Sequence, residues 1–226
     1  MKILITAGGT REDIDPVRGI TNYATGKLGC FIAEKFMQNG AQVTYICAED
    51  SAAPNIPVKR IRNTAQLLQT LETELKTTPY DCVIHTMAVS DYSPCGTAAV
   101  DTPQFTNISF DEISSKKISS DSPYQVVLLK RQPKAINLVK EIQPNTILVG
   151  TKLLNLASEE ELTQAAYKQI NKSGSDYVLA NSKEQVTKHA HKAILINKTG
   201  IIGKAKSKQE IAELIYNKVT NSEETL

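Results

Sequence analysis

The sequence has few of the features that mark membrane, secreted or nucleic-acid-binding proteins. None of its apolar stretches approaches the roughly 18 residues that a membrane-spanning helix needs, and no signal-peptide pattern comes before the first apolar segment. The net charge is only +2, so neither sign is in enough excess to attract nucleic acid or a lipid surface. We therefore expect a cytoplasmic protein that binds neither nucleic acid nor membranes.

Metal-binding patterns are also missing. The four cysteines (Cys30, Cys47, Cys82 and Cys95) show no CxxC spacing, and the three histidines show no ligand spacing. We expect free thiols and no zinc site. What is present is an ordinary globular composition, 41% hydrophobic and 22% charged over 226 residues, which fits one large domain.

Short apolar segments alternate with segments of helical periodicity along the chain. Strands are predicted at 2–7, 42–47, 58–61, 81–87, 124–130, 146–153 and 176–180, and helices at 26–39, 64–75, 133–142, 158–172 and 207–219. Nearly continuous apolar strands predict one doubly wound α/β domain over residues 1–226, with a mainly parallel, Rossmann-like sheet. Residues 88–123 predict a long irregular flap, and residues 191–206 a C-terminal β-hairpin.

The helix starts have recognisable signals. Thr64 is expected to cap the second helix, and Ser158 and Ser207, each followed three residues later by glutamate, are expected to form capping boxes. Pro133 fits the first turn of the third helix.

Residues 1–29 combine a strand, a glycine turn, a long polar loop and a helix start. Gly9 and Thr10 follow the carboxyl end of the strand, where ligands bind in α/β sheets. At the helix start, Thr25 can cap, Gly26 lets a ligand approach the backbone, and Lys27 supplies positive charge. The stretch indicates an anion site, although a structural glycine turn and a capped helix with a solvated lysine also fit it.

Further charged side chains lie near predicted strand ends, in the flap or on helices: Asp91, Lys117, Lys130, Arg131, Lys168 and Lys172. A carboxylate at Asp91 suits a ribose or Mg²⁺, and an Asx turn would also explain it. Each cation is by itself more often a solvated surface residue. As a group they favour a site for a polyanionic substrate such as a nucleoside triphosphate.

The first stretch also carries a longer signature. Residues 5–29, ITAGGTREDIDPVRGITNYATGKLG, resemble the N-terminal signature of phosphopantothenate–cysteine ligases. Four further segments resemble that family in the same order: MAVSDY at 87–92, KISS at 117–120, LKRQP at 129–133 and LANS at 179–182. In many bacteria this ligase is fused behind a flavin-dependent decarboxylase, so a start at Met1 predicts the stand-alone bacterial form.

The resemblance implies an enzyme of coenzyme A biosynthesis that joins 4'-phosphopantothenate and L-cysteine. The substrate carboxylate attacks the α-phosphate of CTP, with ATP as the alternative, and releases pyrophosphate. The cysteine amine then attacks the acyl-cytidylate, giving 4'-phosphopantothenoyl-L-cysteine and CMP. Mg²⁺ accompanies the nucleotide, and the family commonly forms homodimers. Cations and N–H groups should stabilise the negative charge that both steps develop.

The same resemblance implies roles for individual residues. Asn22, Lys117 and Arg18 match catalytic positions, and Asn22, Arg18, Ala88 and Asn181 match contacts to substrate or intermediate. Nucleotide-binding positions are matched by Asp91, Lys117, Lys130, Arg131, Lys168 and Lys172, to which the anion-site pattern adds Gly9, Thr10, Thr25, Gly26 and Lys27. No metal ligand is assigned.

The chain departs from the family pattern at two places. Ser119 and Ser120 stand where the family has two lysines, which lowers the charge of the flap. Residues 149–152, VGTK, replace a run in which an aromatic ring often packs on the base, so the choice between CTP and ATP stays open. The flap changes are the only feature that favours an alternative, a nucleotide-binding or regulatory module without turnover. The presence of Asn22, Asp91 and Lys117 argues against it.

A nicotinamide-dependent oxidoreductase is a third interpretation. Glu49 or Asp50, after the second strand, would bind a ribose hydroxyl. Tyr23 and Lys27 even have the YxxxK spacing of short-chain dehydrogenases. They lie at a helix entrance, however, and the GxGxxG fingerprint is missing, so this interpretation is disfavoured.

Overall fold

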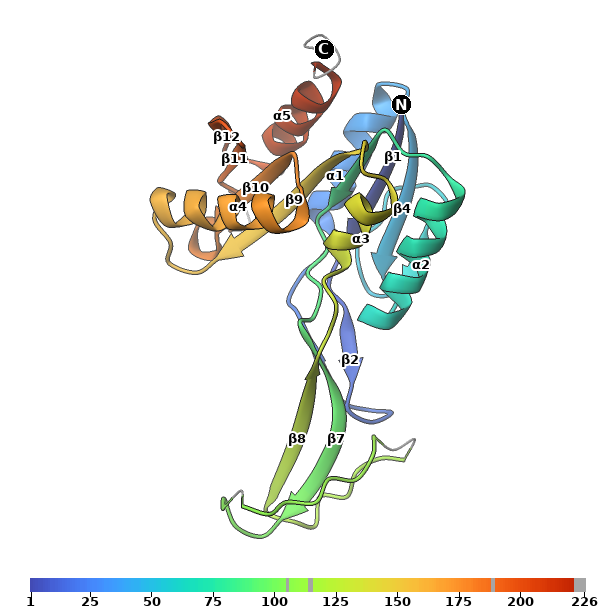
Figure 1. The fold of residues 1–226 in the computed structure, drawn as a ribbon, viewed down its shortest axis with the longest axis vertical. Coiled ribbons are helices and arrows are strands. Elements are labelled where there is room, and N and C mark those ends of the chain that lie inside the picture. The colour runs from blue at the N-terminus through green and yellow to red at the C-terminus, as the bar shows by residue number, and fades with distance from the viewer. Residues whose placement is uncertain (105, 114–115, 188–189, 222–226) are drawn as a thin grey trace.

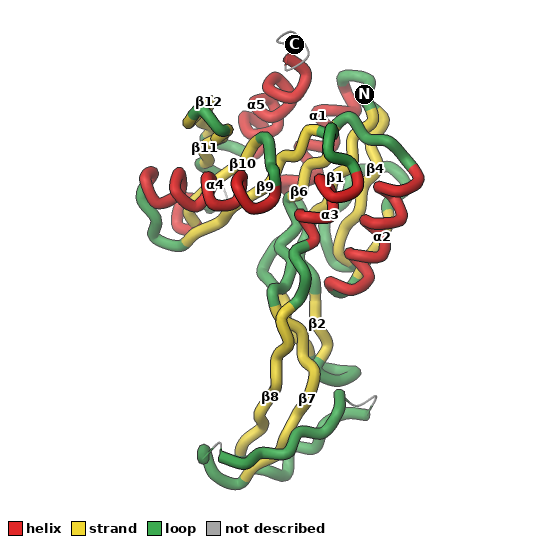
Figure 2. Tube along the Cα trace, in the orientation of Figure 1, coloured by secondary structure: helices red, strands yellow, loops and turns green. Residues whose placement is uncertain are grey.

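A mainly parallel sheet forms the centre of the protein (Figures 1 and 2). The structure is a computed structural model that describes residues 1–104, 106–113, 116–187 and 190–221. The sheet is eight-stranded, in the order β12-β11-β10-β9-β6-β1-β4-β5. Its strands are β1 (Lys2–Ala7), β4 (Gln42–Ala48), β5 (Lys59–Ile61), β6 (Cys82–His85), β9 (Ile147–Leu154), β10 (Tyr177–Ser182), β11 (Ala193–Asn197) and β12 (Gly200–Ala205).

Helices cover both faces of the sheet. On one face, α1 (Lys27–Gln38) and α5 (Lys208–Thr220) bury Phe36 and Ile215 in the same apolar cluster. On the other face lie α2 (Thr64–Thr77), α3 (Ala135–Ile142) and α4 (Glu159–Ser173). The expected doubly wound, Rossmann-like α/β fold is confirmed. The helices lie on both faces because the apolar strands need cover on both sides.

The C-terminal hairpin is confirmed as well. β11 and β12 pair antiparallel, and β11 pairs antiparallel with β10, so the hairpin extends the parallel part of the sheet. The four cysteines are free thiols. Within the described part of the chain, no helix has the length and apolar character needed to cross a membrane.

The flap differs most from expectation. Its first part is a nine-residue strand, β7 (Tyr92–Val100), which pairs antiparallel with β8 (Tyr124–Arg131). The strand expected at 124–130 therefore exists, but it belongs to a two-stranded arm that projects from the main sheet (Figure 1). Pro94 and Gly96 interrupt the usual strand pattern, and the pairing shifts between them. Flap residues 105 and 114–115 lie outside the described residues.

The polar loop after β1 contains short strands that the sequence did not predict. β2 (Arg11–Asp13) and β3 (Gly19–Thr21) form an antiparallel hairpin. Arg62, just before α2, holds this hairpin through Asp13, with N–O distances of 2.7 and 3.0 Å.

The helix starts show which capping expectations were right. Ser158 with Glu161 forms the expected capping box of α4. At α5 the Ser207 side chain accepts from the Glu210 N–H, but the Glu210 carboxylate accepts from the Lys206 N–H, so the capping box expected there is only half formed. Thr64 is not the cap of α2, because the side chain of Asn63 accepts from the Gln66 N–H. α3 begins at Ala135 with Lys134 as its N-cap, so Pro133 precedes the helix.

Candidate active site

The carboxyl ends of β1 and β6 are joined beyond the strands themselves. The Ala88 N–H donates to the Gly8 carbonyl at 2.8 Å, and the Thr10 N–H donates to the Ala88 carbonyl at 3.1 Å. The glycine turn and the segment that leads to Asp91 therefore lie side by side. This is the edge at which an α/β sheet binds ligands.

Asn22 completes what we call the strand-end cluster (Gly9, Asn22 and Ala88). The Asn22 side chain is exposed and donates through Nδ2 to the Ala88 carbonyl at 3.2 Å. A Cβ added at Gly9 would lie 2.7 Å from the Asn22 carbonyl oxygen, so this glycine is needed for the loops to approach. The structure brings together three residues that the sequence placed in the site.

Gly8 has a related role. Its φ of +90° lies in the left-handed region, and an added Cβ would lie 1.9 Å from Ser51 Oγ. Only glycine fits this turn between β1 and the loop that follows β4.

Thr10 is placed differently from expectation. It is fully buried, and its hydroxyl accepts from the Ser90 N–H at 2.9 Å, while its own N–H is taken by Ala88. Neither group is turned toward a ligand. Thr10 holds the segment that carries Ala88 and Asp91 in position.

The buried carboxylate of Glu12 holds the hairpin that follows Thr10. Glu12 is 5% exposed, and its Oε1 accepts from both the N–H and the hydroxyl of Thr64, at 2.9 and 2.7 Å. These bonds tie the β2–β3 hairpin to the start of α2, where a negative charge is stabilised. No sequence pattern indicates this burial, because a glutamate in a polar loop is normally exposed.

Arg18 links the hairpin to the flap. It makes a two-pronged ion pair with Asp15, at 2.9 and 2.6 Å, and donates to the Ile118 carbonyl at 2.8 Å. The Ile118 N–H donates back to Asp15 at 3.2 Å. These bonds bring the flap segment that carries the exposed Lys117 to the hairpin.

The Asp15 carboxylate is the anchor of this contact. It is buried at 2% exposure, and the Arg18 guanidinium holds the pKa of Asp15 well below its ordinary range, against the opposing effect of burial. Backbone N–H groups of Val17, Arg18 and Ile118 act in the same direction. Because both partners of Arg18 are internal, we regard its position as fixed before any ligand binds.

The start of α1 keeps the character of an anion site. Gly26 is the N-cap, with a φ of 73° in the left-handed region, and no side chain caps the helix. The expected cap by Thr25 was wrong, and the Thr25 carbonyl instead accepts from the Ala52 N–H at 3.0 Å. The first-turn N–H groups and the exposed Lys27 are compatible with a bound phosphate.

Asp91 has a partner that the sequence reasoning missed. Its exposed carboxylate forms an ion pair with Lys134, the N-cap residue of α3. Lys130 and Arg131 lie nearby in sequence, exposed at the base of the arm. A lysine directly after Pro133, at an expected helix start near a strand end, was the available signal.

Three predicted residues lie away from the strand-end cluster or are engaged elsewhere. Lys168 and Lys172 are in the last two turns of α4, which returns from the carboxyl end of β9 to the amino end of β10. One chain alone therefore does not bring them to the cluster. Asn181 is 7% exposed, with its Nδ2 3.4 Å from His191 Nε2.

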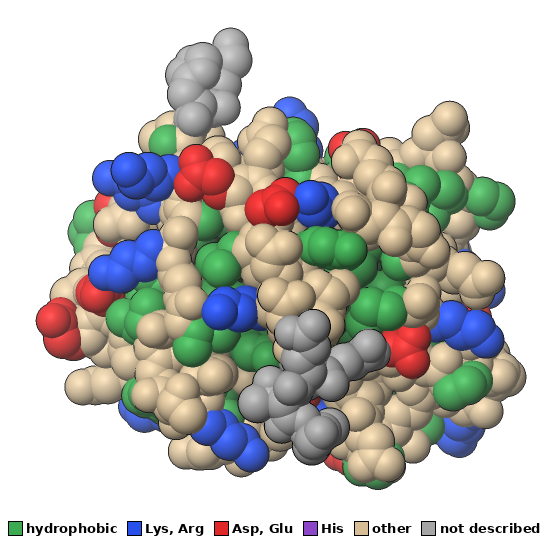
Figure 3. Space-filling model, turned by 90° about the horizontal axis from the view of Figure 1, so that it is seen from above, with side chains coloured by type: hydrophobic (Ala, Val, Ile, Leu, Met, Phe, Trp, Pro, Cys, Tyr) green, Lys and Arg blue, Asp and Glu red, His purple; other side chains and the backbone are tan. Residues whose placement is uncertain are grey.

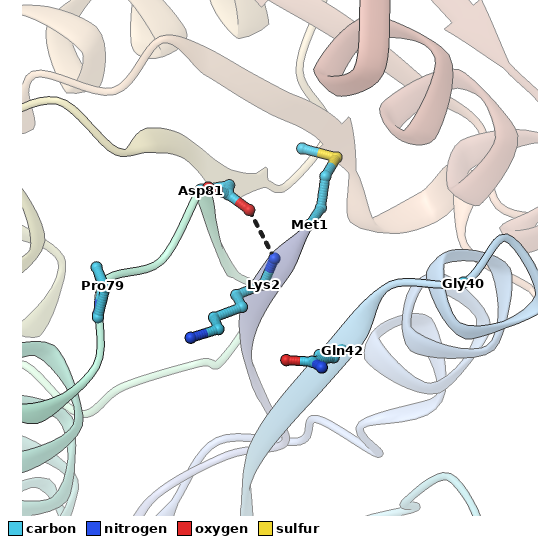
Figure 4. Close-up of a pocket in the computed structure, with 6 residues that line it drawn as sticks. All are labelled: Met1, Lys2, Gly40, Gln42, Pro79 and Asp81. Atoms are coloured by element: carbon cyan, nitrogen blue, oxygen red, sulfur yellow. Dashed lines mark hydrogen bonds between the residues drawn. The ribbon is translucent and has the colours of Figure 1, made fainter.

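Two surface pockets lie at the amino edge of the sheet. They have volumes of about 450 and 710 Å³ and share Met1, Pro79 and Asp81, and Figure 4 shows the smaller one. Neither contains a residue of the predicted site. The face opposite the arm shows acidic and basic side chains interspersed (Figure 3).

Among the residues that the structure describes, no group of three His, Cys, Asp or Glu residues is placed to hold a metal ion. Mg²⁺ commonly keeps several waters and uses one or two carboxylates together with substrate phosphates. Asp91 fits such a role for a metal ion that arrives with a nucleotide.

The comparisons with known proteins agree with the fold. Residues 1–222 match the family model described as DNA/pantothenate metabolism flavoprotein C-terminal domain. The chain belongs to this family. A bifunctional coenzyme A biosynthesis protein, CoaBC, from Thermococcus kodakarensis is 36% identical over 220 residues, which are 96% of this chain and 50% of that protein. The chain thus spans about half the length of the curated relatives it matches most fully.

Solved structures extend the likeness. The DNA/pantothenate metabolism flavoprotein from Streptococcus pneumoniae has a TM-score of 0.87 and 36% identity, and the match covers 98% of this chain and 99% of that one. A Cab2 variant in complex with phosphopantothenate-cysteine has a TM-score of 0.70 and 18% identity, covering 99% of this chain and 89% of that one. At that identity the likeness shows the fold alone.

His85, at the end of β6, generates a pH prediction. It is 7% exposed, its Nδ1 lies 2.7 Å from Thr6 Oγ1, and burial lowers the pKa of His85 to about 4. Between that value and the ordinary 6.5, the unfolded chain holds more protons than the folded one, so stability falls as the pH drops through this window. Between pH 7 and pH 5, we expect the free energy of unfolding to fall by about 2 kcal/mol less in His85→Gln than in the unaltered protein.

The measurement is urea unfolding of the unaltered protein and His85→Gln at both pH values. His191, whose pKa burial also lowers to about 4, stays in both proteins and serves as an internal constant. Equal losses of stability in the two proteins would contradict the assignment.

Proposed function

We propose that this protein is the ligase that joins 4'-phosphopantothenate to L-cysteine in coenzyme A biosynthesis. The observation that carries the proposal is the family match over residues 1–222, together with the strand-end cluster that gathers Asn22 and Ala88 at the carboxyl edge. The relative from Thermococcus kodakarensis is named for coenzyme A biosynthesis, and the Cab2 structure contains phosphopantothenate-cysteine. Both facts support the proposal.

The proposed chemistry has two steps. A carboxylate oxygen of 4'-phosphopantothenate attacks the α-phosphate of the nucleotide, and the bond to pyrophosphate breaks. The cysteine amine then attacks the acyl carbon, loses a proton, and displaces the nucleoside monophosphate together with the former carboxylate oxygen. Activation is needed because a free carboxylate is a poor electrophile.

Each residue has a proposed part in these steps. The Asn22 amide and Arg18 face the acyl group and stabilise developing negative charge, and Lys117 of the flap adds a cation. Asp91 contacts the ribose of the nucleotide or its Mg²⁺. The start of α1, with Gly26 and Lys27, receives a phosphate. CTP is the favoured nucleotide, and ATP is the alternative.

The distant Lys168 and Lys172 remain part of this proposal as nucleotide contacts, together with Lys130 and Arg131. We also keep Asn181 as a contact to the intermediate. The separation of Lys168 and Lys172 from the strand-end cluster within one chain is a reason to expect a second copy at the site.

The arm supports a proposed homodimer. It exposes large apolar side chains, with Tyr92 51%, Tyr124 44%, Leu128 43% and Leu129 42% accessible. An isolated two-stranded ribbon is marginally stable in water, so an arm of this kind needs a partner surface.

The first test is a complete reaction with 4'-phosphopantothenate, L-cysteine, Mg²⁺ and either CTP or ATP. We expect pyrophosphate that depends on 4'-phosphopantothenate, and amide product that depends on all components. Absence of substrate-dependent pyrophosphate with every nucleotide would sink the ligase proposal. Nucleotide binding without turnover would favour the binding module.

Asn22→Asp separates the two steps. In the proposed reaction Asn22 holds the acyl-nucleotide for attack by cysteine, and a carboxylate there would repel its phosphate. We expect amide formation to fall about a hundredfold, with a smaller fall in pyrophosphate release, as for loss of one oxyanion donor. An equal loss of both activities would contradict this role. Asn39→Asp, at the exposed end of α1, is the matched control.

The dimer is tested by sedimentation velocity on a Leu128→Glu/Leu129→Glu double variant. Like charges placed on a buried apolar interface should shift the protein to a monomer. Leu156→Glu, at a residue 76% exposed outside the arm, should leave the assembly unchanged. A monomeric unaltered protein, or a double variant that still dimerises, would count against the arm as the interface.

A further inference from the structure

Lys134 lies at the carboxyl edge beside Asp91, and neither the sequence motifs nor the family assignment gives it a role. Its ammonium pairs with Asp91, and both side chains are half exposed, at 51% and 57%. This differs from Arg18, whose partner Asp15 has a side chain with no exposure. Exposed ion pairs contribute little to stability, so separating this pair requires little free energy.

The backbone fixes Lys134 near the nucleotide-binding edge. The Gln132 N–H donates to the Asp91 carbonyl at 2.8 Å, and Gln132 Nε2 donates to Ser93 Oγ at 2.5 Å. Lys134 follows two residues later and starts α3. Its position is therefore set by Asp91 and the base of the arm even when the ion pair opens.

The surroundings of Lys134 favour an anion. α3 starts with no side-chain cap, so the N–H groups of its first turn add partial positive charge next to the ammonium. Lys130 and Arg131 are exposed just before it. Asp91 is the carboxylate that the structure pairs with Lys134, and it is also the residue proposed to contact the nucleotide.

We propose that Lys134 is a nucleotide-phosphate contact that exchanges partners. Without nucleotide, Lys134 neutralises Asp91. When the nucleotide and its Mg²⁺ bind, the ammonium moves to a phosphate oxygen, and Asp91 turns to the ribose or the metal ion. The exchange keeps both charges compensated in both states. This inference rests on the proposed function, because it takes a nucleoside triphosphate as the ligand.

The experiment measures equilibrium binding of CTP and of ATP, each with Mg²⁺, by calorimetry. Lys134→Met should weaken binding about tenfold or more, as expected for loss of one charge-assisted contact, and should reduce the salt dependence of binding. Lys134→Arg should restore most of the affinity. The thermal midpoint should change little in each case.

The matched control is Lys204→Met. Lys204 forms an ion pair of similar exposure with Glu159, 61% and 47%, on the hairpin side of the sheet. This control should bind nucleotide like the unaltered protein. If Lys134→Met also does so, the inference is wrong.

A double variant separates a direct contact from an indirect one. If Lys134 only positioned Asp91, Lys134→Met would have no further effect in an Asp91→Asn background. The proposal expects a further loss of nucleotide affinity there. The full ligase assay on the unaltered protein is run in parallel. If the unaltered protein turns over and Lys134→Met binds nucleotide normally, only this inference is overturned. If the unaltered protein shows no nucleotide-dependent ligase activity, the proposed function is overturned.

Discussion

The hydrogen bonds that continue the β1–β6 ladder past the edge of the sheet are the contact on which the site depends. They join Ala88 to Gly8 at 2.8 Å and Thr10 to Ala88 at 3.1 Å. Without them, the glycine turn and the Asp91 segment would be separate loops. With them, the carbonyl of Ala88 is fixed where the side chain of Asn22 reaches it. Strand pairing thus creates the geometry that loops alone would not keep.

Charge is distributed around this edge at two levels. Asp15 and Glu12 are buried carboxylates that are satisfied by internal donors, so they fix the hairpin and the flap. Asp91 and Lys134 are exposed and pair with each other, so they are free to change partners at small cost. The first kind of contact provides preorganised positions, and the second provides groups that respond to a ligand. The proposed reaction, in which a polyanionic nucleotide binds, would use both.

The sequence predicted the parts whose causes are local. Apolar runs located β1, β4 and β9, and the Ser158–Glu161 spacing located the start of α4. The arm was missed because β7 contains Pro94, Gly96 and small residues, and becomes a strand only through β8. The contacts of the buried Thr10 and Glu12 and the Asp91–Lys134 pair join residues 43 to 80 positions apart, which no local pattern reports. The roles of Asn22 and Lys117 came from the family resemblance.

In the proposed reaction, the substrate carboxylate is activated at the carboxyl edge by attack on the α-phosphate of a nucleotide. The most direct measurement uses 4'-phosphopantothenate whose carboxylate carries a heavy oxygen isotope, with mass spectrometry of the released nucleoside monophosphate. We expect one labelled oxygen in the monophosphate and none in pyrophosphate, because the attacking carboxylate oxygen stays on the α-phosphate when cysteine displaces it. Formation of the amide with unlabelled monophosphate would contradict this mechanism.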